Sequence, residues 1–219
     1  MHSAIKADRV WQVAQNTAFR EALCRALAPL AITHRATHQA FDLNPTPAPI
    51  DYARTSALTP DFSESQFRHA LGQFATGVTV VTAVNPAGGL VGLTVNSFNS
   101  VSLAPPLVLW SLALKSSSMA AVLACKHYAV NVLSSEQAAL ATQFSTKGID
   151  RYNGVHWHPG ACGAPLLVGA VATFECFNRS RHEEGDHIIF VGEVERCSHR
   201  DQVDPVIYHS GQFYTGGLS

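Results

Sequence analysis

Residues 74–102 read FATGVTVVTAVNPAGGLVGLTVNSFNSVS, and this stretch decides the fold. Val78–Val84 and Leu90–Phe98 are short apolar runs rich in β-branched residues, which favour strands. Asn85–Gly89, between the two runs, contains a proline and two adjacent glycines, a composition typical of a turn. The stretch therefore predicts two consecutive β-strands joined by a tight connection.

More strands are expected further along the chain. Helices are expected where Ser63 and Ser134 each precede a glutamine by three residues, since this spacing is that of a capping box. Six or more strands with two or three helices at the margins predict a mainly β, barrel-like domain with peripheral helices, and not alternating βαβ units. The additional strands are expected at Leu107–Ala113, Tyr128–Leu133, Val168–Phe177 and His187–Glu195.

The beginning of the chain has a different composition. Apolar residues recur at three- and four-residue steps over about residues 8–30, which predicts an amphipathic helix. Four prolines then punctuate a polar run without periodicity from about residue 33 to residue 61. We therefore expect an N-terminal helical extension with a linker over residues 1–61, and one domain over residues 62–219. A dispensable extension and a docking arm for a partner subunit fit this leader equally well.

Composition narrows the class of protein. Hydrophobic residues make up 47% and charged residues 14%, which suits a large core, and the formal net charge is −1. The composition therefore gives no sign of a basic surface that would bind nucleic acid or an anionic membrane. No stretch approaches the roughly 20 apolar residues of a membrane helix. Five cysteines without a CxxC pair, and no secretory signal, predict free thiols in the cytoplasm.

Several common active-site motifs are missing from the sequence. It contains no GxGxxG, no GxxxxGK[ST] and no GxSxG. His182 and His187 are five residues apart, whereas zincin helices need a four-residue separation. A loop site made of His156, His158 and Cys162 would lack a fourth ligand, so no metal site is expected.

The densest polar signal lies at the end of the second expected strand. Short hydroxyls and backbone amides at a strand end can hold phosphate oxygens. A polar turn capped by serine and asparagine is the better interpretation of this segment when it is taken alone. Strand alternation would place Thr94, Asn96, Phe98 and Ser100 on one face, and Ser97 with Asn99 on the other.

A second hydroxyl cluster comprises Lys115, Ser116, Ser117 and Ser118, directly after another apolar strand. Lys115 adds a positive charge that suits a phosphate. By itself the cluster is more typical of an N-cap before a helix over Met119–Ala124. Two such loops, each following an apolar strand, together favour a bound phosphate.

The third candidate is Gly185-Asp186-His187, at the entry of an apolar strand. A histidine beside a carboxylate can hydrogen-bond a carboxamide or donate toward developing negative charge. A histidine with a purely structural role is the more common situation for a single residue of this kind.

Read in order, these segments resemble the short-chain flavin reductase family, the reductase partners of two-component flavin-dependent monooxygenases. The resemblance is collinear over about residues 62–216. It rests on residues 74–82, 92–108, 128–133, the helix over 137–144, and residues 185–194 and 208–214. The chain has Ala104 and Asn96 where the family often has an acidic residue and a serine, and the choice between FMN and FAD stays open.

The resemblance implies a flavin-binding, Greek-key-like split β-barrel that works as a homodimer. It implies NAD(P)H-dependent reduction of FMN or FAD, with NADH or NADPH as co-substrate and a separate oxygenase component as partner. His187 would lie by the flavin and act in catalysis, and Gly185, Asp186 and His187 would bind the nicotinamide. The flavin-binding residues would be Thr94, Val95, Asn96, Ser97, Phe98, Ser100, Val101, Ser102, Lys115, Ser116, Ser117 and Ser118.

Other functions remain open on the same fold. A non-catalytic flavin-binding or storage protein is the main alternative, and a purely structural interaction module is another. An oxidase of the pyridoxamine-phosphate type is disfavoured, because no basic cluster is dedicated to a phosphorylated amine. Without a Rossmann motif the nicotinamide must stack over the flavin in an open cleft, which favours a loosely held flavin.

Overall fold

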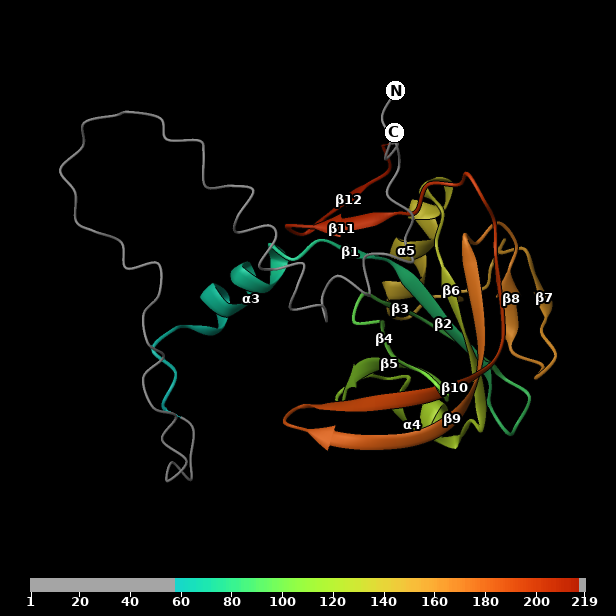
Figure 1. Cartoon of the computed structure of the whole chain (residues 1–219), viewed down its shortest axis with the longest axis horizontal. Coiled ribbons are helices and arrows are strands. Elements are labelled where there is room, and N and C mark those ends of the chain that lie inside the picture. The colour runs from blue at the N-terminus through green and yellow to red at the C-terminus, as the bar shows by residue number, and fades with distance from the viewer. Residues whose placement is uncertain (1–57, 217–219) are drawn as a thin grey trace, which may run out of the picture. The chain divides into compact units, whose positions relative to one another are not determined.

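The computed structural model describes residues 58–216 (Figure 1). The predicted helix over about 8–30 and the linker up to residue 57 lie outside these residues, and residues 58–61 contain no helix or strand. Within them the elements are, in chain order, α3 (Glu64–Gly72), β1 (Thr76–Gly77), β2 (Thr79–Val84), β3 (Leu90–Val95), β4 (Asn99–Leu103), β5 (Pro106–Ala113), α4 (Met119–Ala124), β6 (His127–Val132), the 3₁₀ helix η1 (Ser135–Gln137), α5 (Ala138–Ser145), β7 (Trp157–Pro159), β8 (Pro165–Leu167), β9 (Ala172–Glu184), β10 (His187–His199), β11 (Ile207–His209) and β12 (Gln212–Tyr214).

The main sheet has seven antiparallel strands in the order β3-β2-β6-β9-β10-β5-β4. Its two edge strands, β3 and β4, follow one another in the chain across the corner Asn96–Phe98. They are not paired with each other, so the curled sheet stays open along this seam (Figure 1). The prediction of a mainly β split barrel with peripheral helices is confirmed.

The core lies on both faces of β2, which explains the unbroken apolar run in the sequence. Val81 belongs to a cluster on one face and Val80 to a cluster that packs under α5 on the other. In the first cluster Trp110 stacks on Phe190 with ring centroids 4.6 Å apart, and Tyr128 packs edge-on at 5.6 Å. Strands buried on both faces lose the alternation of apolar and polar residues.

Both capping boxes predicted from the sequence are at the helix starts. The backbone N–H of Ser63 donates to Oε1 of Gln66 at 2.8 Å, and Gln66 N–H donates back to Ser63 Oγ at 3.2 Å. The N–H of Ser134 likewise donates to Oε1 of Gln137 at 3.1 Å. In the described residues no helix is long and apolar enough to cross a membrane.

The predicted strand Leu90–Phe98 is wrong at its end, because β3 stops at Val95 and a new strand begins at Asn99. The hydroxyl of Ser97 donates to the carbonyl of Ser111 at 3.2 Å and accepts from its N–H at 3.0 Å. This pair of bonds holds the corner against β5. The alternation predicted for residues 94–100 therefore does not hold.

The predicted strand Val168–Phe177 is also displaced, since β9 runs over Ala172–Glu184. Gly169 has a φ of +94°, which ends any extended run from Val168. Glu175 on β9 is buried and accepts a hydrogen bond from the N–H of Cys162 at 3.2 Å. The loop that contains Cys162 therefore covers this part of β9.

Candidate functional site

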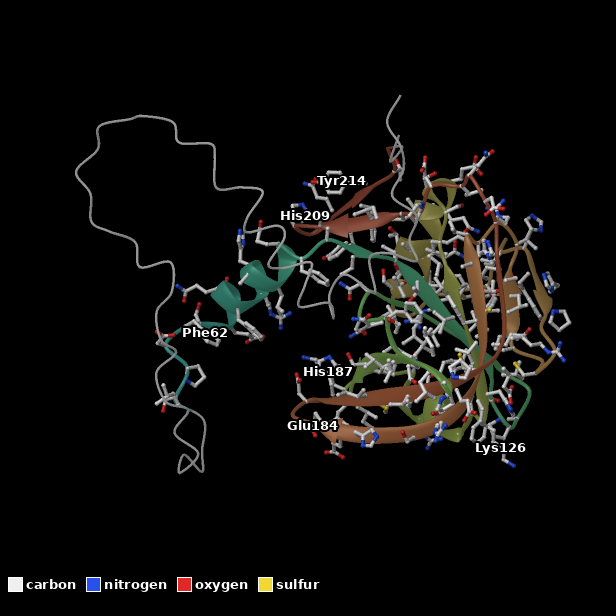
Figure 2. The ribbon with its side chains drawn as sticks, viewed as in Figure 1. Phe62, Lys126, Glu184, His187, His209 and Tyr214 are labelled. Carbon is white, nitrogen blue, oxygen red and sulfur yellow. The ribbon has the colours of Figure 1, made fainter. Side chains whose placement is uncertain are left out.

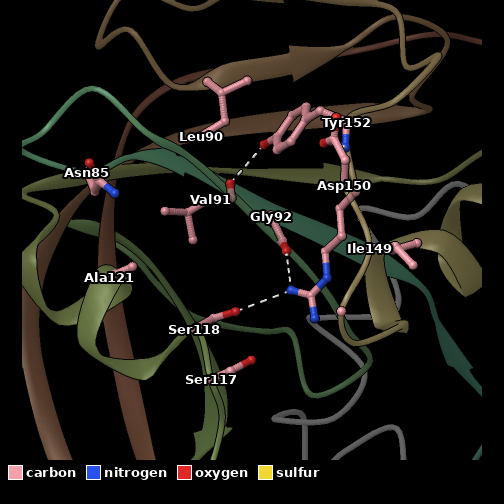
Figure 3. Close-up of a pocket in the computed structure, with 12 residues that line it drawn as sticks. Asn85, Leu90, Val91, Gly92, Ser117, Ser118, Ala121, Ile149, Asp150 and Tyr152 are labelled. Carbon is pink, nitrogen blue, oxygen red and sulfur yellow. Dashed lines mark hydrogen bonds between the residues drawn. The ribbon is translucent and has the colours of Figure 1, made fainter.

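Two hollows lie near the segments singled out in the sequence. The first, here called the Arg151 pocket, has a volume of about 560 Å³ (Figure 3). It is lined by the start of β3, the loop before α4 and residues 148–152. The second, here called the α3 cleft, has a volume of about 820 Å³ and lies between α3, the corner Asn96–Phe98 and the turn after β11.

The Arg151 guanidinium lies against one wall of the first hollow. Nη1 donates to the carbonyl of Gly92 at 2.8 Å and to Oγ of Ser118 at 3.2 Å, and Nε donates to the carbonyl of Thr146 at 2.9 Å. Among the described residues no carboxylate forms an ion pair with Arg151, and Nη2 makes no hydrogen bond. The hollow therefore offers a cation without an ion-pair partner and with unused donors, which suits a phosphate, although the Asp150 carboxylate lines the same hollow.

Close packing under this wall explains the glycine in β3. A Cβ at Gly92 would lie 2.3 Å from the ring of Phe144 and 3.1 Å from the hydroxyl of Tyr152. Tyr152 donates from that hydroxyl to the carbonyl of Val91 at 2.8 Å, as Figure 3 shows. Burial raises the pKa of Tyr152, so its hydroxyl stays a neutral donor. Only glycine at position 92 lets β3 lie this close to the aromatic pair.

The cluster Lys115–Ser118 divides between the pocket and its surroundings. Ser117 and Ser118 line the Arg151 pocket, whereas Lys115 is exposed outside the lining. Ser118 occupies the N-cap position of α4, but its hydroxyl makes no cap bond and instead accepts from Arg151. The hydroxyl of Ser116 accepts from the N–H of Ser118 at 3.3 Å.

The other predicted flavin-binding residues lie around the corner. Thr94 donates its hydroxyl to the carbonyl of Ala141 at 2.7 Å, and the Val95 side chain is buried in the core. Asn96, Ser97 and Phe98 line the α3 cleft. Five of the twelve predicted flavin contacts therefore line one of the two hollows, and Thr94, Val95, Lys115 and Ser116 line neither.

Ser100, Val101 and Ser102 lie on the edge strand β4. Its pairing with β5 is irregular between Ser100 and Ser102, so Val101 has no partner in register. Val101 is 45% exposed, and the hydroxyl of Ser102 accepts from the N–H of Ala104 at 3.2 Å. None of these three residues lines either hollow.

Gly185 and Asp186 form the tight turn between β9 and β10, His187 is the first residue of β10, and Gly185 has the positive φ of +61° that such a turn needs. Nδ1 of His187 lies 2.6 Å from Oδ1 of Asp186. This hydrogen bond and the charge of the imidazole lower the pKa of Asp186. The carbonyl of Asp186 accepts from the N–H of Leu114 at 2.9 Å, so the turn lies directly beside Lys115. Figure 2 shows His187 near the end of this hairpin.

Arg151 is the residue that sequence reasoning missed. It follows α5 in the run Gly148-Ile149-Asp150-Arg151-Tyr152, where no periodicity or motif marks it. A single basic residue beside an acid in a loop is normally a solvated surface residue. In residues 58–216 no group of three or more His, Cys, Asp or Glu side chains could hold a metal.

Comparison with known proteins gives one consistent result. Residues 71–217 match the family model described as flavin reductase like domain. FMN reductase (NADH) SmoA of Agrobacterium fabrum is 48% identical over 67% of this chain and 83% of that protein. The flavin-dependent monooxygenase reductase subunit HsaB of Rhodococcus jostii is 38% identical over 69% of this chain and 76% of that subunit. The solved Streptomyces globisporus NADH:FAD oxidoreductase SgcE6, in complex with NAD and FAD fragments, is 36% identical, with a TM-score of 0.68 over 74% of this chain and 98% of that one.

Proposed function

Because this chain belongs to the flavin reductase-like family, we propose that it oxidises NADH and passes the hydride to FMN or FAD for use by a separate monooxygenase. The observation that carries the proposal is the match over residues 71–217, together with 48% identity to an enzyme named as an NADH-dependent FMN reductase. Relatives named as reductase subunits of flavin-dependent monooxygenases support the role of the reduced product.

The Arg151 pocket fits the phosphate end of a flavin. The unpaired guanidinium and the hydroxyls of Ser117 and Ser118 would hold its oxygens. Strands rise about 3.3 Å per residue, so Gly92 in this pocket and Asn96 in the α3 cleft are separated by about 13 Å along the chain. That separation suits a ligand whose phosphate and ring system are joined by a flexible chain. The ring would then lie toward the corner Asn96–Phe98.

A bound flavin supplies the hydride acceptor, and the protein supplies position and charge. Asp186 holds Nδ1 of His187, which leaves Nε2 free to contact the nicotinamide. Because burial is slight here, the pair can meet a substrate that enters from solvent: the His187 side chain is 43% exposed and that of Asp186 82% exposed. His187 would orient the carboxamide of the nicotinamide. NADPH as an alternative donor belongs to the same proposal.

An exposed apolar surface supports a homodimer. Phe67 and Leu71 on α3 and Phe74 just after it are about half exposed or more, and Leu103 on β4 is 87% exposed. β4 is also an edge strand, with one side of its backbone unpaired. A second copy of this chain would cover these groups. Light scattering at micromolar concentration should give twice the mass of the chain, and a fully active monomer would contradict the proposal.

The domain boundary and the location in the cell are further parts of the proposal. The compact unit Thr59–Ser219 supports a catalytic domain over residues 62–219 that follows an extension over residues 1–61. The four described cysteines are all free thiols, which supports a place in the reducing cytoplasm.

The deciding experiment is anaerobic mixing of the purified chain with NADH and added FMN or FAD. Bleaching of the visible flavin absorbance, at a rate proportional to enzyme concentration, is the expected result. A flavin storage protein would bind the flavin and leave NADH unoxidised. Omission of the chain and omission of the flavin are the two controls.

A further inference from the structure

We propose that the outer edge of β9 pairs with the same edge of a second copy of this chain, antiparallel and centred on His182. This contact is separate from the apolar surface of α3 and β4, and it goes beyond the proposed function. It would join two homodimers through their β9–β10 hairpins.

The hairpin of β9 and β10 carries a free edge. β6 pairs with β9 only over Ala172–Phe177, and the N–H of Asn178 then donates to the carbonyl of Lys126 at 2.8 Å. Beyond Asn178, β9 pairs only with β10 among the described residues. One side of its backbone therefore has no partner strand and can accept one. Figure 1 shows this hairpin at the margin of the sheet.

The regular part of this edge has a residue at its exact middle. Ser180–Glu184 are in continuous register with β10, whereas Arg179 has no partner there and marks an irregularity of the β-bulge type. His182 is therefore the central residue of the regular edge. A two-fold axis beside His182 would pair the segment with itself over its whole length.

The charges along this edge are complementary to themselves. Residues 179–184 read RSRHEE, so the basic residues come first and the acidic residues last. Antiparallel pairing centred on His182 places Arg181 of each copy opposite Glu183 of the other. Opposite charges at directly opposed positions of antiparallel strands are favourable. Moving the centre by one residue would oppose Arg181 to Arg181 or Glu183 to Glu183, so the charges select one register.

The side chains that would form these pairs are available. Arg181 and Glu183 are exposed, and neither takes part in an ion pair among the described residues. Charges on an edge strand commonly prevent association, because they repel the same charges of another copy. Here the two signs are ordered so that parallel pairing is repulsive and antiparallel pairing is attractive.

This edge is distinct from the surfaces already described. β10 and β5 lie between β9 and β4 in the sheet, so the two contacts would use different margins. Strands rise about 3.3 Å per residue, so pairing centred on His182 would keep the Asp186 residues of the two copies about 26 Å apart along the strands. The pairing therefore leaves both nicotinamide turns open. Two separate two-fold contacts would join homodimers into a tetramer.

The first test is a crosslink in the full-length chain without flavin or nicotinamide. His182→Cys places two thiols opposite each other at the axis, at a separation that a disulfide can close. Mild oxidation should give a covalent dimer on a non-reducing gel. Glu184→Cys is the matched control, because the proposed register keeps its two copies about 13 Å apart along the strands. The wild-type chain gives the background from its exposed Cys197.

The second test exchanges the charges. A five-residue strand pair covers less than the roughly 1,200 Å² of a stable interface, so the mass of the wild-type chain should double only about a hundredfold above micromolar concentration. Arg181→Glu alone and Glu183→Arg alone should each abolish this doubling. An equimolar mixture of the two variants should restore it, because both pairs then join opposite charges. Both substitutions are at exposed positions, and unchanged melting temperatures confirm that the variants fold.

A wild-type mass that does not rise with concentration would leave the edge to a different chain and would overturn the proposal. Equal crosslinking at positions 182 and 184 would overturn it as well, since it would indicate random collision. Association that survives both charge variants, or a mixture that does not recover, would place the contact elsewhere. None of these outcomes involves flavin, so the proposed function is tested independently by NADH oxidation.

Discussion

Nη1 of Arg151 lies 3.2 Å from Oγ of Ser118, and this hydrogen bond joins the segment after α5 to the first turn of α4. The same nitrogen donates to the carbonyl of Gly92 in β3, so one guanidinium connects the segment after α5 with both α4 and β3. Nη2 stays without a partner in the described residues. Arg151 therefore both fixes the pocket and presents its charge to a ligand.

Arg151→Met should weaken the binding of FMN and FAD about tenfold to a hundredfold, because a hydrogen bond to a charged group contributes about 1.5–3 kcal/mol. Three internal hydrogen bonds are also lost, so the melting temperature should fall. Flavin dissociation constants are measured by fluorescence quenching well below that temperature. Arg151→Lys keeps the charge and should restore part of the affinity.

A matched control separates affinity from stability. Arg200 also donates to backbone carbonyls, those of Gly169 and Ala170, but lines neither hollow. Arg200→Met should lower the melting temperature and leave flavin affinity unchanged. If both variants weaken flavin equally, Arg151 acts only through the fold.

Asp186→Asn and His187→Ala should act on the nicotinamide and not on the flavin. His187→Ala should raise the Michaelis constant for NADH about tenfold, the value of one good hydrogen bond, with the flavin dissociation constant unchanged. Asp186→Asn should have a smaller effect of the same kind, because an amide still accepts from Nδ1. Glu184→Gln is the control, since Glu184 is opposite His187 in register and equally part of the hairpin. A lower melting temperature with unchanged kinetics would leave His187 only a structural role.

The pH dependence follows from the lowered pKa of Asp186, whose ordinary value is 3.8. A carboxylate with a lowered pKa contributes its interaction above the ordinary value and loses it as the pH falls through the lowered one. Asp186 should therefore stay ionised between about pH 5 and pH 8. The Michaelis constant for NADH should show no acid limb from this residue in that window, and Asp186→Asn should leave the shape of the profile unchanged.

The sequence predicted those features that depend on residues close to one another in the chain. The glutamines at positions 66 and 137 bond to serines three residues before them, and the apolar strands follow from local composition. The corner after Val95 depends on Ser111, fourteen residues beyond Ser97, and no local pattern contains that contact. Two of the three hydrogen-bond partners of Arg151, Gly92 and Ser118, lie 59 and 33 residues away in the chain. Its role could be found only once the fold had brought those segments together.

Ser97→Ala tests whether the corner serine holds the fold or the flavin. Its hydroxyl is occupied by Ser111, so the variant leaves a part-buried N–H without a partner and should lose about 1–3 kcal/mol of unfolding free energy. The resemblance to flavin reductases implies a direct contact with flavin instead, and loss of that contact would raise the dissociation constant about tenfold. Denaturant unfolding and flavin titration of the same variant decide between them. Ser102→Ala, whose hydroxyl accepts a single hydrogen bond beside an exposed turn, is the control for both measurements.

A chain that begins at Leu58 should fold and reduce flavin at the rate of the full-length chain. Residues 58–216 contain both hollows and the Gly185-Asp186-His187 turn, and none of the assigned contacts lies before them. NADH oxidation at saturating FMN, the melting temperature and the mass in solution are measured on both chains.

A folded short chain that has lost flavin reduction would place residues 1–57 in the active site and move the domain boundary. A short chain that reduces flavin but becomes monomeric would identify the leader as the docking arm for a partner subunit. Replacing residues 1–57 with a Gly/Ser sequence of equal length then separates the effect of the leader's sequence from that of its length.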